Sequence, residues 1–393
     1  YKILGEISNS IEYGLNASAK DFDGIHKYLR ITDIDDSSRL FLTDKLSSPD
    51  VNFTEEDYEN YKLQINDLLF ARTGASVGKT YLYRESDGEV YYAGFLIRAR
   101  LHDSYDGNFI FQQTLTDKYK QFIEITSQRS GQPGVNGKEY GDWKIGMTSY
   151  PEQYAIGSLF HTLDDLLASY KDNLANYQSL KATMFSKMFP KSGQTVPEIR
   201  LDGFEGEWDL IKLGDFCDLI TKGTTGKSQS EQGMVNFVKV ENLKDNEIYP
   251  IVKISEEEHF GSLKRSILYE GDILFSIAGT LGRTAIVKNN ILPANTNQAL
   301  AIIRGYKLDT YFLLVVLSGE VVKDYIRKNP TVGAQPNLSL EQVSSLKIKI
   351  PSLDEQQAIG SYFSNLDNLI NSHQEKITQL GTLKKKLLEN MFI

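Results

Sequence analysis

The sequence predicts two α/β domains, related by a pseudo-two-fold axis and separated by a long antiparallel two-helix coiled coil. The first observation behind this prediction is an internal repeat, in which residues 152–189 align with residues 355–392 without a gap. The constant offset of 203 residues takes Gln153 to Gln356. The second observation is that the residues ahead of each segment also match, so a globular half followed by a long helix occurs twice.

Each repeated segment has the apolar periodicity of a long helix. The matched apolar positions include Phe160 with Phe363, Leu163 with Leu366, Leu167 with Ile370, and Leu174 with Ile377. Their spacing of three and four residues, averaging about 3.5, is typical of a helix whose apolar seam faces another helix. A helix of about 38 residues would be about 57 Å long. Because so narrow a seam needs a partner, we expect the two segments to pack together.

The linker fixes the expected direction of the two helices. Parallel helices would require residues 190–207 to travel back along the whole first helix, which about 18 residues at roughly 3.3 Å each could barely do. Antiparallel helices need no such return. The expected organisation is a globular domain at 1–150, a helix at 151–189, the linker at 190–207, a second globular domain at 208–351 and a second helix at 352–393.

The globular halves share a pattern of strands and glycine-containing loops. Residues 28–31 and 237–240 match at an offset of 209 and read as strands. Residues 67–70 and 272–275 are apolar strands that lead into glycine-rich turns. Thr54 and Ser255 each precede three acidic residues, which predicts two short helices with these residues as N-caps.

Composition gives little support for any particular partner. A net charge of −9 and a pI near 5.3 do not favour a nucleic-acid binder, although a local basic surface can coexist with an acidic total. The single cysteine, Cys217, excludes an intramolecular disulfide, and no Cys and His cluster has zinc-ligand spacing. The longest apolar run, at 311–317, is too short to span a membrane, and no signal-like segment starts the chain, so we expect a cytoplasmic protein.

No motif for catalysis stands out. Residues 74–80 resemble a phosphate-binding loop, but they have three residues between the glycines where the Walker pattern has four. The counterpart at 279–284 replaces the lysine with Arg283, so we expect a tight turn that leaves Lys79 and Arg283 free to contact an anion. No adenine-methyltransferase signature, nucleophile triad or nuclease carboxylate pair is evident. His373, opposite Tyr170 in repeat position, is expected to set helix register rather than to bind a metal.

Polar loops are the better-supported functional feature. The loops at 12–20 and 220–227, and the segments 132–136 and 335–339 matched at an offset of 203, are rich in Asn, Gln, Ser, Thr and basic residues. These side chains read base edges and hold phosphates, although surface loops are polar in any protein. Two such domains joined by a coiled coil suit a target with two separated parts.

In the order and duplication of these motifs, the chain resembles the specificity (S) subunits of type I restriction-modification systems over essentially its whole length. The segments that carry the resemblance are the two EQ-AIG helix starts, residues 67–70 with 74–79, residues 271–275 with 279–283, residues 297–300, and residues 197–208. The first half lacks a counterpart of 197–208, with which the family's first domain usually opens, so we expect a segment to be missing before Tyr1.

The resemblance implies a non-enzymatic DNA reader. Each half would be a target recognition domain for one part of a bipartite, asymmetric duplex sequence. The helices would act as a ruler and would dock two methyltransferase subunits, which carry S-adenosylmethionine and methylate adenine, and restriction subunits would join through them. This chain would hold no cofactor of its own. The candidate DNA contacts are Arg72, Lys79, Gln132, Lys222, Thr224, Thr225, Lys227, Lys239, Arg283, Asn297, Gln298 and Gln335.

Two alternatives stay open at this point. The chain could be a scaffold or adaptor, in which the coiled coil organises partner proteins and the halves bind protein or single-stranded nucleic acid. It could also be a DNA reader of a related defence system that lacks a nuclease. A neighbouring gene for an adenine methyltransferase would distinguish both from the specificity subunit.

Overall fold

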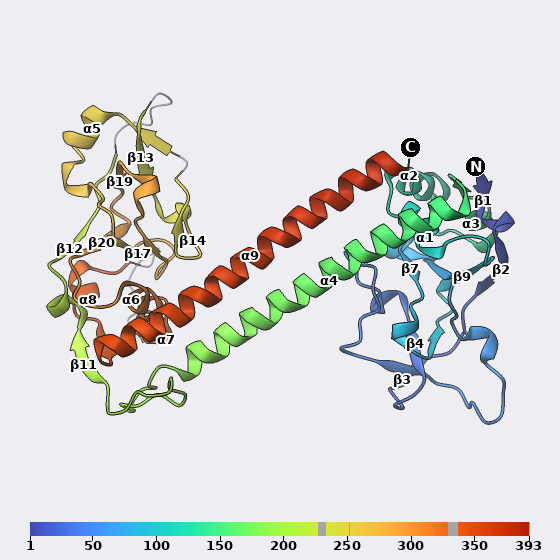
Figure 1. The fold of residues 1–393 in the computed structure, drawn as a ribbon, viewed down its shortest axis with the longest axis horizontal. Coiled ribbons are helices and arrows are strands. Elements are labelled where there is room, and N and C mark those ends of the chain that lie inside the picture. The colour runs from blue at the N-terminus through green and yellow to red at the C-terminus, as the bar shows by residue number, and fades with distance from the viewer. Residues whose placement is uncertain (130, 227–232, 251, 329–336, 393) are drawn as a thin grey trace. The chain divides into compact units, whose positions relative to one another are not determined.

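The computed structural model describes residues 1–129, 131–226, 233–250, 252–328 and 337–392 (Figure 1). The chain divides into two compact units. Unit 1 comprises Tyr1–Asn173 with His373–Ile393, and unit 2 comprises Leu174–Ser372. Both boundaries fall inside the long helices α4 (Tyr150–Lys187) and α9 (Leu353–Met391), so each helix contributes to both units.

Unit 1 is built on a four-stranded antiparallel sheet in the order β2-β9-β6-β7. Its strands are β1 (Lys2–Ile3), β2 (Ser8–Tyr13), β3 (Ala19–Asp21), β4 (Lys27–Leu29), β5 (Ser47–Pro49), β6 (Asp67–Ala71), β7 (Thr80–Leu82), β8 (Val90–Tyr92), β9 (Leu96–Leu101) and β10 (Lys144–Ile145). Its shorter helices are α1 (Gly107–Gln113), α2 (Asp117–Thr126) and α3 (Gly137–Gly141). The strands β4 and β8 form a separate parallel pair.

Unit 2 repeats this plan with the sheet β12-β20-β17-β18 and the parallel pair β13 and β19. Its strands are β11 (Asp209–Lys212), β12 (Leu219–Lys222), β13 (Val235–Val238), β14 (Leu243–Lys244), β15 (Glu247–Ile248), β16 (Val252–Ile254), β17 (Ile273–Ser276), β18 (Thr284–Ile286), β19 (Ala294–Thr296), β20 (Leu300–Arg304) and β21 (Lys347–Ile350). Its shorter helices are α5 (Glu256–Phe260), α6 (Thr310–Leu317), α7 (Glu320–Lys328) and α8 (Leu340–Ser344).

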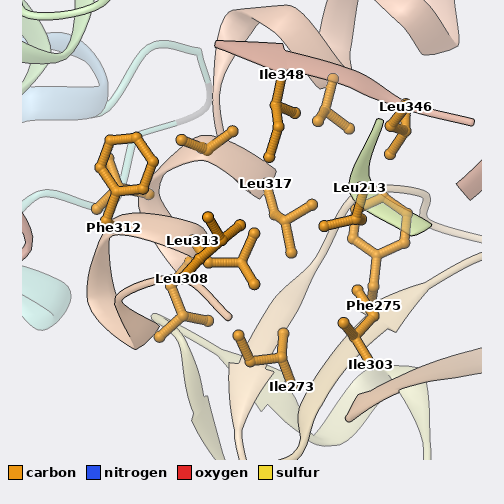
Figure 2. Close-up of a cluster of buried hydrophobic side chains, with 14 of the residues drawn as sticks. Leu213, Ile273, Phe275, Ile303, Leu308, Phe312, Leu313, Leu317, Leu346 and Ile348 are labelled. Carbon is orange, nitrogen blue, oxygen red and sulfur yellow. The ribbon is translucent and has the colours of Figure 1, made fainter. Parts of the chain in front are cut away.

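The core of unit 2 lies between its sheet and the helix α6. Figure 2 shows Ile273, Phe275 and Ile303 from the sheet facing Leu313 and Leu317 from α6, and all five side chains are buried. In unit 1 the corresponding cluster joins strand residues to α1 and to the first turns of α4. The two α/β domains predicted from the internal repeat are therefore confirmed.

A buried arginine–aspartate pair recurs at the start of the central strand of each sheet. Arg100 donates from Nε to Asp67 Oδ1 at 2.8 Å, and the backbone N–H of Gln64 donates to Asp67 Oδ2 at 2.8 Å. In unit 2, Arg304 and Asp272 form the same pair at 2.7 Å. Both carboxylates are buried, where an unpaired charge would be strongly destabilising, so this pairing accounts for the aspartate that begins each apolar run.

A glutamine and a glycine four residues apart dock each long helix onto its unit. In unit 2, Gln356 accepts a hydrogen bond from the backbone N–H of Asp309 at 3.1 Å and donates one to the carbonyl of Pro351 at 2.9 Å. Asp309 is the N-cap of α6. A Cβ at Gly360 would lie 2.3 Å from Asp309 Oδ1, so only glycine allows this approach.

Unit 1 uses the same device with its own residues. Gln153 accepts from the backbone N–H of Asp106, the N-cap of α1, at 3.3 Å, and a Cβ at Gly157 would lie 2.0 Å from the Asp106 carboxylate. The repeated EQ-AIG pattern at the helix starts is thus a docking motif between a long helix and the N-terminus of a short one.

Within each unit, the segments of α4 and α9 run antiparallel. In unit 1, Phe160 packs against Phe392 with ring centroids 5.7 Å apart, and Tyr170 packs against His373 at 5.3 Å. In unit 2, Lys181 forms an ion pair with Asp367, and Phe185 packs against Phe363 at 5.8 Å. In both units, residue numbers rise along α4 as they fall along α9, which is the antiparallel direction.

The structure tests the predicted helix caps and the bounds of two predicted strands. Ser255 caps α5, as predicted, by accepting from the backbone N–H of Glu258. The prediction that Thr54 caps a helix is wrong, because this segment is a turn around Asn52. The Thr54 hydroxyl donates to Asn52 Oδ1 at 2.7 Å, and the backbone N–H groups of Glu55 and Glu56 donate to the carbonyl of Asn52, at 3.2 and 3.3 Å. The predicted strands at 28–31 and 237–240 end at Leu29 and Val238, because a 3-10 turn follows each of them.

In the ranges described, no helix combines the length and the apolar character needed to cross a membrane.

We predict that Gly360→Ala lowers the free energy of unfolding of unit 2 by about 1–3 kcal/mol, because the new methyl group overpacks the contact with Asp309. Ser361→Ala is the control, because Ser361 is the next residue of α9, is exposed and lies in the same unit as Gly360. The control should be neutral or stabilising by up to about 1 kcal/mol. Denaturant unfolding followed by tryptophan fluorescence in a Trp143→Phe background would measure this, because Trp208 then reports on unit 2 alone. Equal effects of the two substitutions would contradict the docking role of Gly360.

Candidate nucleic-acid interface

An arginine stacked between two aromatic rings lies at the end of the central strand of unit 1. Arg72 follows β6, and its guanidinium carbon lies 5.0 Å from the ring centroid of Tyr13 and 5.9 Å from that of Phe95. Both rings are exposed, at 45% and 61% of their surface. The two rings restrict the guanidinium, which is partly exposed, and an oriented, partly exposed guanidinium is suited to binding an anion.

Gln132 lies on the loop next to this arginine. The backbone N–H of Gly74 donates to the carbonyl of Pro133 at 3.0 Å, and that of Val135 donates to the carbonyl of Arg72 at 2.9 Å. These bonds hold the loop that bears the exposed Gln132 against the β6–β7 turn. We call Tyr13, Arg72, Phe95 and Gln132 the unit 1 patch.

Lys79 is not the free cation expected from the sequence. Its side chain is only 8% exposed, and its ammonium donates to the carbonyl of Ile34 at 3.0 Å and pairs with Asp36 at 2.5 Å. Arg283 occupies the same place in unit 2 and donates to the carbonyls of Val240 and Leu243, at 3.3 and 3.5 Å. Both cations therefore brace a hairpin against the turn that follows a strand, although Arg283 is more exposed.

Four of the unit 2 candidates lie on two touching segments, the end of β12 with the loop after it and the loop before β20. The backbone N–H of Thr224 donates to the carbonyl of Thr296 at 3.1 Å, and a Cβ at Gly223 would lie 2.1 Å from the carbonyl oxygen of Asn297. Glycine is therefore required where the loops cross. The candidates that this crossing brings together are Lys222, Thr224, Thr225 and Asn297, with Gln298 exposed beside them.

Lys239 and Arg283 border the same region. Lys239 follows β13, and the backbone N–H of Asn297 donates to the carbonyl of Val238 at 3.3 Å, so Lys239 is close to Asn297 in the fold. Arg283 reaches the carbonyl of Val240. We call Lys222, Thr224, Thr225, Lys239, Arg283, Asn297 and Gln298 the unit 2 patch. The candidates Lys227 and Gln335 lie outside the described residues.

The structure adds Tyr13 and Phe95 to the residues singled out from the sequence. Aromatic residues at strand ends look the same in sequence whether they are buried or exposed, and nothing in the sequence ties either of them to Arg72. The patches offer cations, amides, hydroxyls and aromatic faces, which can bind phosphates and base edges.

No arrangement for catalysis is found in the described part of the chain. Burial and the neighbouring Asp218 raise the pKa of the Cys217 thiol to about 11, so it is not a reactive thiolate near neutral pH. Among the residues that the structure describes, no three His, Cys, Asp or Glu side chains gather where they could hold a metal ion.

We predict that Lys79→Met destabilises unit 1 by about 1–3 kcal/mol, because it leaves the carbonyl of Ile34 without its charged donor. Lys120→Met is the control, because Lys120 is exposed and its ion pair with Asp117 lies on the surface. The control should change the free energy of unfolding by about 1 kcal/mol or less. Fluorescence of Trp143 in a Trp208→Phe background would follow unit 1, and a neutral effect of Lys79→Met would argue against the bracing role.

Comparison with known proteins identifies relatives along the whole chain. Residues 205–382 match the family model described as the type I restriction modification DNA specificity domain. The MjaVIII specificity subunit of a type I restriction enzyme from Methanocaldococcus jannaschii is 22% identical over 380 residues, covering 94% of this chain and 85% of the relative. The putative MjaX specificity subunit from the same organism is 29% identical over 401 residues, covering 98% and 90%.

A solved structure has the same fold. The crystal structure of the type I restriction-modification system S subunit from M. genitalium aligns with a TM-score of 0.68 at 16% identity, covering all of this chain and 95% of that one. The relatives are specificity subunits rather than catalytic subunits, in agreement with the expectation from the sequence. Along nearly its whole length, the chain is therefore similar to specificity subunits of type I restriction-modification systems, and residues 205–382 match the model of their DNA specificity domain.

Proposed function

We propose that this chain reads a bipartite, asymmetric sequence in duplex DNA, with each unit acting as the target recognition domain for one half-site. The observation that carries the proposal is that one fold occurs twice with different surface patches. The unit 1 patch is an arginine between two aromatic rings, with Gln132 beside it, whereas the unit 2 patch consists of two lysines, an arginine, two threonines and two amides without an aromatic ring. Two different surfaces on one scaffold favour two different half-sites.

The chemistry of each patch fits a separate part of DNA recognition. Arg72 has the planar fork that bonds a phosphate or the O6 and N7 edge of guanine. Asn297 and Gln298 carry amides of the type that pairs with adenine, and Lys222 and Lys239 are suited to phosphates. Lys79 is the least suitable of the candidates, because a DNA contact would require it to give up its two internal partners.

The long helices are proposed to form an antiparallel coiled coil that spaces the half-sites and docks two methyltransferase subunits. The antiparallel contacts within each unit support the first part. Exposed leucines support the second, since Leu166 and Leu180 of α4 and their counterparts Leu369 and Leu383 of α9, at an offset of 203, are all exposed. Exposed apolar residues duplicated in this way are suited to two copies of one partner. The partners would carry S-adenosylmethionine and would recruit the restriction subunits.

Base-modification sequencing tests the proposal directly. DNA would be sequenced from cells that express this chain with the methyltransferase subunit of its own genome. We expect methylated adenine in a single split, asymmetric motif that disappears when the chain is omitted. If both proteins are soluble and associated but no such motif is found, the proposal fails and an adaptor role is favoured.

The two patches should control different halves of that motif. We predict that Arg72→Ala weakens methylation through the half-site read by unit 1, and that Lys222→Ala with Thr225→Ala weakens it through the other half-site. A lost specific contact should cost about 1–3 kcal/mol, or about 5-fold to 150-fold in relative rate. Methylation of oligonucleotides altered in one half-site at a time would measure this, with Lys120→Ala as the charge-matched control. Identical effects on both half-sites would contradict the assignment.

The negative net charge of −9 predicts that the chain alone binds DNA weakly. Basic surface on the methyltransferase subunits would complete the DNA-binding surface of the complex. Electrophoretic mobility shifts at increasing salt, with and without those subunits, would measure this. Tight, salt-resistant binding by the isolated chain would be the contrary result.

If the two long helices set the distance between the half-sites, their length should determine the length of the spacer. Inserting about four residues, one turn or roughly 6 Å, at matched positions in both α4 and α9 should lengthen the spacer by about one or two base pairs at 3.4 Å each. The half-sites should stay the same, because neither unit is altered. Base-modification sequencing would again provide the readout. Changed half-sites with an unchanged spacer would refute the ruler.

A further inference from the structure

In unit 2, the linker segment 197–208 covers the place where the two long helices meet the core. Arg200 donates to both carboxylate oxygens of Glu355, at 2.8 and 2.7 Å, and Glu355 is buried at the start of α9. The ring centroid of Trp208 lies 5.9 Å from that of Phe189 and 6.0 Å from that of Phe312. The segment therefore inserts a charged anchor and an aromatic anchor into one site.

The corresponding place in unit 1 is a cavity of about 180 Å³. It is lined by the repeat counterparts, at an offset of 203, of the three residues that the linker contacts in unit 2: Phe109 for Phe312, Glu152 for Glu355 and Phe392 for Phe189. Ile156 and Met391, the counterparts of Ile359 and Met188 in the core cluster that includes Trp208, also line it. The ring centroids of Phe109 and Phe392 lie 5.3 Å apart, close to the 6.0 Å between Phe312 and Phe189.

Burial differs sharply between these counterparts. Met188 is 1% exposed in the core cluster that includes Trp208, whereas Met391 is 36% exposed beside the cavity. Glu355 is buried and paired with Arg200, whereas Glu152 is exposed and accepts only a hydrogen bond from Thr148 among the contacts described. The cavity in unit 1 thus presents the carboxylate and the aromatic walls that the linker segment uses in unit 2.

Strand register places the cavity where a chain like the linker would run. In unit 2, β11 follows Trp208 and pairs with β21, with Lys212 opposite Lys347. In unit 1, Ile3 lies opposite Lys144 in the same register, so Tyr1 is the counterpart of Leu210 at an offset of 209. Tyr1, Gly146 and Met147 line the cavity, and Gly146 and Met147 are the counterparts of the β21 residues that pair with the first residues of β11.

We propose that this cavity is a binding site for an extended peptide segment that carries an arginine and a tryptophan at the spacing of Arg200 and Trp208. The arginine pairs with Glu152, and the indole packs against Phe109 and Phe392. Lys118 and Lys144 also line the cavity, so the cavity does not attract positive charge in general. The arginine is favoured only at the position where it pairs with Glu152.

A synthetic peptide provides the first test. A fluorescently labelled peptide of residues 191–208 would be titrated with the full chain and followed by anisotropy. We expect saturable binding of one peptide per chain. Replacing Arg200 or Trp208 of the peptide by alanine should weaken binding by about tenfold or more, because each is a buried anchor.

A variant of the chain locates the peptide. Glu152→Gln should weaken binding by about tenfold, because it removes the charge that pairs with the arginine while keeping the shape of the side chain. Glu124→Gln is the matched control, because Glu124 is exposed on α2 of the same unit and does not line the cavity. Binding that Glu152→Gln leaves unchanged would place the peptide elsewhere and overturn the proposal.

Joining the segment covalently to the chain makes the test independent of the affinity of a free peptide. The sequence of residues 197–209 would be joined directly before Tyr1, which sets its tryptophan two residues ahead of Tyr1, as Trp208 stands ahead of Leu210. We expect a higher midpoint of thermal unfolding than for the same extension with its arginine and tryptophan replaced by alanine. Glu152→Gln should abolish that difference. If the peptide does not bind and the two extended chains melt alike, the proposal is wrong, and neither result involves DNA.

Discussion

The contact between each long helix and the N-cap of a short helix is the constraint on which the rest of each unit depends. Gln356 satisfies the backbone N–H of the capping aspartate, and Gly360 lets that aspartate approach the helix backbone. Both groups sit on one face, four residues apart, so the contact fixes the rotation of the helix as well as its position. The core clusters then form around that fixed helix, because Ile359 and Phe363 follow on the same face.

The repeat shows which parts of a unit can change without loss of the fold. The offset between the units is 209 residues at Ile34, 205 at Asp67 and 203 at Gln153. The largest change in length therefore lies between Ile34 and Asp67, in loops and short strands outside the four-stranded sheet. The sheet, the buried Arg–Asp pair and the helix docking remain the same in both units. A scaffold of this kind can carry different surfaces because its packing does not depend on them.

Sequence patterns were sufficient to predict the elements that pack in the same way in both units. Apolar periodicity and a constant offset predicted the long helices, and the matched apolar runs predicted β6 and β17. Local signals failed where another side chain engages the predicted cap. Thr54 and Ser255 are each followed by three acidic residues, yet the Thr54 hydroxyl donates to Asn52 in a turn, and only Ser255 caps a helix.

The candidate interface was harder to predict for a related reason. A lysine after a glycine-rich turn has the same sequence context whether its ammonium meets solvent or a carbonyl, and the carbonyl that binds Lys79 lies 45 residues away at Ile34. Arg72 was identified by its type and place, but its stacking on Tyr13 and Phe95 depends on the neighbouring strands β2 and β9. Long-range contacts of this kind have no local signal.

An internal repeat also allows one half of a protein to serve as a reference for the other. A residue whose counterpart has the same partners in both units, such as Asp67 with Asp272, is explained by the fold. When a residue lacks partners that its counterpart has, the shared fold does not explain its exposure. Glu152 and Phe392 belong to this second group, because their counterparts Glu355 and Phe189 contact Arg200 and Trp208 of a segment of known sequence. The comparison therefore indicates the chemistry of a ligand from within a single chain, since the covered copy supplies the arginine and the tryptophan that fit the open one.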